Sequence, residues 1–170
     1  MPTTRKFEEA VVWLNGNSLA GQIAELELPD IEWDLVDHET ISGIGMPQYP
    51  TKLKELECTL NWASYSPELA AAAANPFKAA QLQIRSNYGE NTAAGKVGDR
   101  LLRIDLTGRF VKNGAGKLKA GEMERESMMV VTYYREVYEG IEQLAVDVTL
   151  PSYRVLGQDM LAQRRINLGG

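Results

Sequence analysis

The sequence predicts a mainly β (α+β) fold of several strands and one short helix. Apolar and polar residues alternate in five segments, which is typical of strands buried on one face. These segments are 24–28, 56–62, 82–84, 102–106 and 144–150. One further stretch, 66–75, has the residues of a helix with both ends marked. A length of 170 residues suits a single domain.

The segment 128–134, Met-Met-Val-Val-Thr-Tyr-Tyr, is apolar on both faces. Such a strand is covered on both sides, so we expect a core on one side and a helix or neighbouring subunit on the other. Glu-Gly at 139–140 predicts a turn that joins it to a strand at 142–150 as an antiparallel hairpin. Asn-Gly at 15–16 predicts a second hairpin turn, because both residues tolerate positive φ.

The helix has a start signal and a stop signal. Ser66 is a suitable N-cap, Pro67 fits the first helical position and Glu68 suits the positive end. Leucine and five alanines at 69–74 propagate the helix, and Asn-Pro at 75–76 ends it. Its alanine face has only small side chains, which predicts close packing on a sheet. We expect no catalytic role for this helix.

Few residues could support catalysis or metal binding. The single cysteine, Cys58, excludes a disulfide framework and a cysteine-based metal site, and its alternating apolar neighbours predict that it is buried. The single histidine, His38, lies in the acidic stretch 34–39 without the spacing of a zinc motif. We interpret it as a solvated residue on a polar strand face.

The distribution of charge and apolar residues narrows the class of protein. The longest apolar run, 69–74, is far shorter than the roughly 20 residues of a membrane helix. The N-terminus has no apolar signal segment, so we expect a soluble intracellular domain. The net charge is −5, and the first 50 residues hold nine acidic and two basic side chains. This acidic charge distribution excludes a basic surface stripe that would bind nucleic-acid phosphates.

Two segments do not fit the strand pattern. The first, 41–50, is rich in glycine and proline yet carries large apolar side chains, which predicts a surface for a partner. The second, 112–121, is basic and rich in glycine. It lacks a phosphate-binding pattern, since leucine follows Gly-Lys at 116–117. We interpret it as a flexible hairpin tip.

Several short motifs follow one another in a specific order and spacing. They are Val12-Trp13-Leu14-Asn15-Gly16, Leu26-Glu27-Leu28-Pro29, Met46-Pro47, Thr107-Gly108-Arg109, Gly121-Glu122-Met123-Glu124, Val130-Val131-Thr132-Tyr133-Tyr134-Arg135 and Gln163-Arg164-Arg165-Ile166-Asn167-Leu168-Gly169. In this order they resemble the major tail tube proteins of contractile-tailed bacteriophages. The resemblance covers nearly the whole chain, from about Val12 to the C-terminus.

The resemblance implies a single tail tube domain over residues 1–170, an antiparallel β-barrel or sandwich flanked by one short helix. Family members form hexameric rings that stack into a tube for DNA passage, without catalytic residues, metal or cofactors. The implied partners are other copies of the chain, the tail sheath, the baseplate or tube initiator, the tail terminator and, during assembly, a tape measure protein in the lumen. DNA only passes through, and no membrane is involved. The implied location is the virion tail, assembled in the host cytoplasm.

Two alternatives to a phage tail tube remain open from the sequence. One is a tube subunit of a contractile injection or secretion apparatus that delivers protein. The other belongs to a different class: a monomeric β-barrel binding module or hydrolase. The chain departs from the pattern of the tail tube family in two stretches, the acidic 30–39 and the alanine-rich 69–74.

Two segments are predicted to make contacts between subunits. We expect about 41–55 to bridge successive rings, and its contact residues are Ile41, Ile44, Met46 and Tyr49. We expect about 160–170 to dock on a neighbouring subunit through an alternating apolar edge and two arginines, which are Arg164, Arg165, Ile166 and Leu168. The alternative for the second segment is a frayed terminus.

The lumen of a DNA-conducting tube should repel phosphates. Glu25 and Glu27 share one strand face, while Ala24, Leu26 and Leu28 on the other face can fill the core. We therefore predict that both glutamates line the lumen, where each subunit of a ring adds two carboxylates. Further candidates for this lining are Glu57, Glu32 and Asp34. The competing interpretation pairs these carboxylates with Arg164, Arg165 or Lys52 between subunits.

Overall fold

A computed structural model describes residues 2–41 and 43–170 of the chain. The described residues are mostly in antiparallel strands, joined by tight turns and one long hairpin arm. The elements in chain order are β1 (Thr4–Leu14), β2 (Asn17–Ser18), β3 (Ile23–Glu27), β4 (Trp33–Asp37), β5 (Gln48–Leu53), β6 (Glu57–Trp62), α1 (Pro67–Ala74), β7 (Ala80–Thr92), β8 (Gly95–Asn113), β9 (Lys117–Lys119), β10 (Glu122–Tyr138), β11 (Ile141–Asp147), β12 (Ser152–Val155), β13 (Gln158–Asp159) and α2 (Ala162–Asn167).

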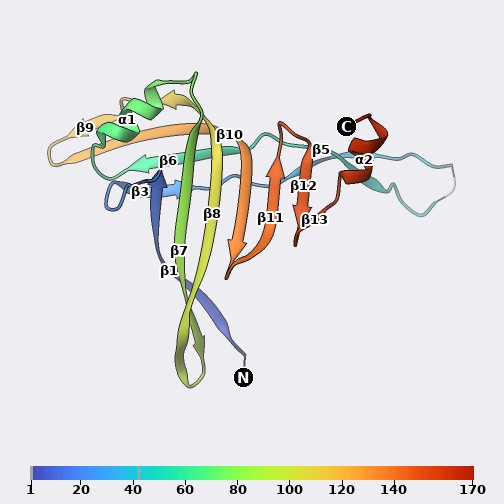
Figure 1. Ribbon diagram of the computed structural model, residues 1–170, viewed down its shortest axis with the longest axis horizontal. Coiled ribbons are helices and arrows are strands. Elements are labelled where there is room, and N and C mark those ends of the chain that lie inside the picture. The colour runs from blue at the N-terminus through green and yellow to red at the C-terminus, as the bar shows by residue number, and fades with distance from the viewer. Residues whose placement is uncertain (1, 42) are drawn as a thin grey trace.

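The main sheet has the strand order β13-β12-β11-β10-β8-β7-β1-β2. Strand β10 also pairs with β6, which in turn pairs with β3. In Figure 1, β3, β6 and the first half of β10 run across the upper ends of β1, β7 and β8. The sheet therefore folds over itself into two facing layers with α1 at one end, as the prediction of a mainly β fold with a flanking helix requires.

Strand β10 forms the corner between the two layers. One of its edges pairs with β8 along most of its length, while the other pairs with β6 up to Val130 and with β11 from Tyr133 onward. The ladder with β8 has a register shift between Val131 and Tyr133. Such a shift bends a strand and increases its local twist, which lets β6 and β11 leave the same edge of β10 in different directions.

The core fills the space between the folded layers and beneath α1. Leu69 of α1 is fully buried, and Trp62 donates a hydrogen bond from Nε1 to Ser127 Oγ at 3.0 Å. The guanidinium of Arg125 covers the Trp62 ring at 4.3 Å from its centroid. Other fully buried side chains are Leu56, Cys58, Leu60, Leu82, Leu106, Phe110, Met129 and Val146. Burial thus alternates along β6 and β8 as the sequence predicts.

The predicted turns and helix start are confirmed. The Asn-Gly turn at 15–16 has φ values of 47° and 87°, and the Glu-Gly turn at 139–140 has values of 48° and 79°. The side chain of Ser66 accepts a hydrogen bond from the Leu69 amide and caps α1, which begins at Pro67.

Two predicted boundaries differ from the structure. The strand expected to reach residue 150 ends at Asp147, because its carboxylate accepts hydrogen bonds from the amides of Thr149 and Leu150 and turns the chain. The stretch 112–121 includes the end of β8 and all of β9, which pairs with β10, so the residues outside strands within it are 114–116 and 120–121.

Gly108 is required where β8 passes β10. A Cβ atom at this position would lie 2.2 Å from the carbonyl oxygen of Val130, and this backbone cannot move away without breaking the corner. Gly108→Ala should therefore lower the free energy of unfolding by more than about 2 kcal/mol, measured by chemical denaturation. Gly98→Ala is the matched control, since a Cβ there meets nothing within 4 Å. Equal effects of the two substitutions would contradict the close approach.

Candidate assembly surfaces

The first candidate surface is the arm, the hairpin of β4 and β5 that forms a separate two-stranded sheet. In Figure 1 the arm extends away from the body of the molecule, past α2. Its ladder runs from Trp33 opposite Leu53 at the base to Asp37 opposite Gln48. The Trp33 ring packs edge-on against Tyr153 at 5.2 Å, which anchors the base of the arm to the body.

Polar contacts between the two sides of the hairpin, within and just outside β4 and β5, hold the arm in its hairpin form. Gln48 donates to the Asp37 carboxylate at 2.7 Å, and Lys54 donates to the Glu32 carboxylate at 2.6 Å. The hydrogen bond to Glu32 also raises the pKa of Lys54. Because an isolated two-stranded hairpin is marginally stable in water, these contacts and the aromatic anchor are what keep the arm extended.

The end of the arm carries apolar side chains that touch almost nothing in the chain. Ile41 and Ile44 have relative exposures of 109% and 111%, as in a free peptide, and Met46 and Tyr49 are also more than half exposed. These are the four residues that the sequence analysis assigns to contacts between rings. An apolar group of this kind in water favours association with a second surface.

The second candidate surface is the C-terminal segment, where the structure corrects the prediction of an alternating extended edge. Residues 162–167 form the helix α2. Arg165, predicted to dock on a neighbour, pairs with Asp159 and donates to the Pro151 carbonyl at 2.7 Å within its own chain. The Asp159 carboxylate also accepts from the Leu161 amide at the start of the helix. The alternation of apolar residues in this segment did not indicate these contacts.

The remaining three predicted docking residues of this segment face away from the core. Ile166 and Leu168 are 63% and 79% exposed. Arg164 forms no ion pair with any residue in the described part of the chain. Helix α2 therefore presents an apolar and cationic surface beside the base of the arm.

A groove of about 1110 Å³ lies between α2, the ends of β11 and β12, and the base of the arm. Its apolar lining includes Leu53, Val148, Leu150, Leu161 and Leu168. Its charged lining consists of Lys52, Arg154, Arg164, Arg165 and Asp147. The two segments predicted separately to make subunit contacts, 41–55 and 160–170, thus meet at one groove.

The predicted lumen residues Glu25 and Glu27 lie on β3 and are exposed. Glu25 accepts a hydrogen bond from Asn61 at 3.4 Å, and neither glutamate forms an ion pair within residues 2–41 and 43–170. A register shift between Ile23 and Glu25 leaves Ala24 exposed, so the expectation that Ala24 fills the core is wrong. Leu26 and Leu28 do pack against the core.

Comparison with known proteins decides the family. The family model for phage tail tube protein FII matches residues 4–169. The chain belongs to the phage tail tube protein FII family. A curated relative, the tail tube protein of Escherichia phage P2, is 27% identical over 179 aligned positions, which span 99% of both chains. The resemblance stated from the sequence motifs is thereby confirmed.

Solved structures share the fold of this tail tube protein. A chain from the sheath/tube terminator of an extracellular contractile injection system, in the extended state, matches 76% of this chain and 91% of its own, with a TM-score of 0.57 and 12% identity. A chain from the sheath-tube complex of such a system matches 76% and 86%, with a TM-score of 0.54 and 13% identity. The fold is therefore that of contractile-system tube components.

Family membership establishes that the chain is a phage tail tube subunit, a structural protein of the virion tail and not an enzyme. Its single cysteine agrees with this role, because burial raises the pKa of the Cys58 thiol to about 12. Among the residues described, no group of three or more His, Cys, Asp or Glu side chains could hold a metal ion. No helix in the same residues is long and apolar enough to cross a membrane.

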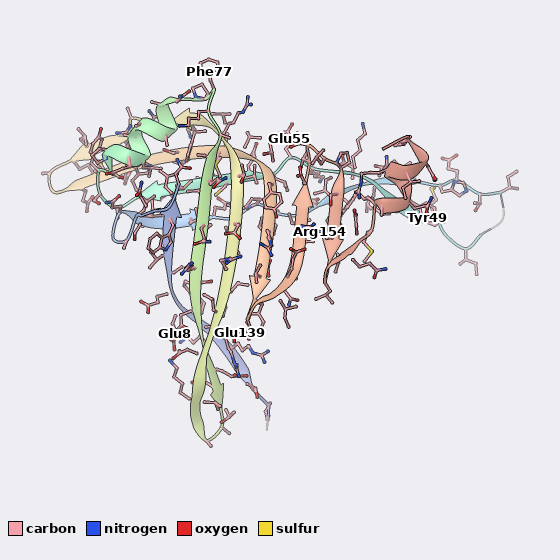
Figure 2. The ribbon with its side chains drawn as sticks, in the orientation of Figure 1. Glu8, Tyr49, Glu55, Phe77, Glu139 and Arg154 are labelled. Carbon is pink, nitrogen blue, oxygen red and sulfur yellow. The ribbon has the colours of Figure 1, made fainter. Side chains whose placement is uncertain are left out.

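One charged cluster in this tail tube subunit was missed by the sequence analysis. Near the turn of the β7–β8 hairpin, Glu90 is only 7% exposed. Its carboxylate forms ion pairs with Arg100 at 2.7 Å and with Arg5 at 3.3 Å. Nearby, Lys96 pairs with Glu8 at 3.0 Å, and Glu8 is labelled in Figure 2. Only the register of β1, β7 and β8 brings these residues together, so short-range patterns could not reveal them.

Glu90 should make the stability of this hairpin end depend on pH. The hydrogen bond from Arg100, with the charges of Arg100 and Arg5, lowers the pKa of Glu90 against the opposing effect of burial. Its stabilisation is therefore fully present above the unfolded pKa of about 4.3 and is lost as pH falls through the lower folded value. Glu90→Gln should lower Tm at pH 7, and the difference from the unmodified chain should shrink toward about pH 3. The exposed Glu122→Gln is the control, and a difference that does not depend on pH would contradict this role.

Proposed function

We propose that the chain forms hexameric rings that stack into a hollow tube, through which phage DNA passes into the host during infection. The observation that carries this proposal is the match to the tail tube family over residues 4–169. The relative from phage P2, similar over its full length, carries the name of a tail tube protein. A tube subunit acts by position and shape, so its function rests on surfaces that bind further copies.

The edges of the main sheet support assembly into rings. Strand β1 pairs with β7 along its length, but among the residues that the structure describes its other edge pairs only with the two-residue strand β2, at Trp13 and Leu14. The opposite end of the sheet is the two-residue β13. Unpaired edges invite pairing with another chain, and a head-to-tail contact of unlike surfaces closes into a ring when its rotation fits.

The proposed partners follow from the same role. They are further copies of the chain, the tail sheath, a tube initiator or baseplate, the tail terminator and a tape measure protein in the lumen during assembly. The similar structures come from assemblies that contain a sheath, a tube and a terminator. We further propose that assembly takes place in the host cytoplasm.

A second candidate function is a tube of a contractile injection apparatus that delivers protein. The observation in its favour is that the two similar solved structures belong to an extracellular contractile injection system. Both candidates share the tube and differ only in its cargo.

Negative-stain microscopy with size-exclusion chromatography of the purified chain tests the proposal. Rings or tubes with a central channel are the expected result. A sharp monomer peak at 18.9 kDa at high protein concentration, with no rings, would overturn it in favour of a monomeric binding module. Encapsulated DNA in complete particles then distinguishes the DNA tube from the protein-delivery tube.

The exposed end of the arm should be required for growth of the tube. Ile44→Asp with Met46→Asp places two carboxylates where apolar contact is proposed, while the core, which these residues do not touch, should keep its stability. The expected products are folded subunits or single rings that do not elongate, counted by microscopy. Phe77→Asp, at a strongly exposed apolar position outside the arm, is the control. Tubes of normal length from the double variant would refute the assignment of 41–55 to ring stacking.

We also propose that Glu25 and Glu27 line the lumen. Both carboxylates are exposed and lack cationic partners among the described residues, so a ring would gather them into a negative band. The potential of such a band extends about 8 Å at physiological salt, which lets it act on passing DNA without holding it tightly.

Reversal of this charge should make the tube retain DNA. Tubes of the unmodified chain should not bind a short labelled duplex, whereas Glu25→Lys with Glu27→Lys should bind it in a salt-sensitive manner during co-sedimentation. Glu55→Lys with Glu122→Lys causes the same change of net charge at two other exposed positions. If this control retains as much DNA, or if a ring structure shows Glu25 and Glu27 paired with cations at subunit borders, the lumen assignment is wrong.

A further inference from the structure

The arm carries complementary features at its two ends. Its far end presents Ile41 and Ile44, both with exposures above 100%. Its base forms one wall of the groove beside α2, through Trp33 and Leu53. One copy of the chain therefore holds both an apolar projection and an apolar recess.

The charges of the two features are also complementary. The strand β4 and the residues just after it bring Asp34, Asp37 and Glu39, which are exposed. The groove has Lys52 and Arg164, which form no ion pair with any residue that the structure describes. Its one acidic lining residue, Asp147, is engaged by the amides of Thr149 and Leu150. An acidic arm entering a cationic groove gains charge-assisted contacts around an apolar centre.

The arm cannot occupy the groove of its own chain. The paired residues from Trp33 to Asp37 extend about 3.3 Å each, which puts the far end more than about 13 Å from the base. The amide of His38 donates to the Pro47 carbonyl at 2.9 Å and continues the hairpin beyond this ladder. The full exposure of Ile41 and Ile44 agrees with an extended arm. An arm that fills this groove must therefore belong to another copy of the chain.

We infer that the arm of one subunit inserts its isoleucines into the groove beside α2 of a subunit in the next ring. The occupant is a second copy because this chain itself supplies both the matching shape and the matching charge. Projection and recess lie on different surfaces, so the contact is heterologous and can repeat without closing, as a growing stack requires. The prolines at 47 and 50 reduce the entropy lost when the arm is held. This inference rests on the proposed stacked tube and names its contact.

Helix α2 is the element that shapes the recess. Arg165, held by Asp159 and the Pro151 carbonyl, fixes α2 against the body and leaves Arg164 and Leu168 at the groove. The two neighbouring arginines thus have separate tasks: Arg165 positions the helix in its own chain, and Arg164 meets the arm of the next subunit.

Disulfide crosslinking between variants that each carry one added cysteine tests the contact. Ile44→Cys and Leu168→Cys subunits are mixed, assembled and mildly oxidised, and a crosslinked dimer of twice 18.9 kDa is expected on a non-reducing gel. The native Cys58 can stay, since it is fully buried and its thiol has a pKa of about 12. Ile44→Cys mixed with Phe77→Cys is the matched control, because Phe77 is 88% exposed but lies on the body of the molecule, well away from Tyr49 of the arm (Figure 2). At least tenfold more dimer than in this control supports the inference.

A charge exchange provides a second measurement that does not depend on thiol chemistry. Glu39→Arg and Arg164→Glu should each shorten the tubes at low salt, since each places like charges in the contact. The double variant should recover at least half of the normal tube length. Recovery of this kind requires that the two residues lie close together in the assembly.

The outcomes separate this inference from the proposed function. Tubes that form without crosslinking above the control, and without recovery in the double variant, would overturn the arm-to-groove contact and leave the tube intact. Crosslinking of Leu168→Cys to a sheath subunit in complete particles, with none to the arm, would assign the groove to the sheath and also overturn it. A chain that stays monomeric in every condition would refute both proposals.

Discussion

The backbone pairing of β10 is the constraint on which the rest of the structure depends. This strand pairs with β8 on one edge and with both β6 and β11 on the other, so it belongs to both layers of the fold. Because β6 and β11 share the second edge of β10, this strand must bend between them. The bend brings the Val130 carbonyl against Gly108. The core beneath α1, the strand β11 and the segment that leads to α2 all take their positions from this corner.

A fold organised in this way leaves its assembly surfaces outside the core. The arm, the groove beside α2 and the two ends of the main sheet surround a core that includes none of the predicted contact side chains. Such a separation has a physical advantage for a structural subunit. Contacts at Ile44 or Leu168 can change the association of copies without a cavity or a buried charge in the folded chain.

The charged residues divide into two groups with different tasks. Glu90, Asp159 and Glu142 are held by arginines of their own chain and stabilise the hairpin end, α2 and the β10–β12 region. The acidic residues from Glu25 to Glu39, apart from Glu32 with Lys54, form no ion pair in residues 2–41 and 43–170. Unpaired carboxylates on an exposed strand and an arm contribute little to folding and are available to repel DNA or to meet the cations of another subunit.

The sequence by itself indicated the strands with alternating or fully apolar residues, the two hairpin turns, the capped helix and the family, but not the strands β5, β9 and β12. These features depend on residues close together in the chain, such as Ser66 before Pro67, or on motifs kept in order. It also predicted subunit contacts at Ile44, because a solvent loop rarely needs such a side chain, and at Leu168, because the C-terminal segment alternates apolar residues. Only the tertiary structure decided that 162–167 is helical, that Arg165 binds Asp159 and that Glu90 is enclosed by two arginines. Each of these depends on the register of strands or on contacts across a turn, which set distances in space that local spacing along the chain does not contain.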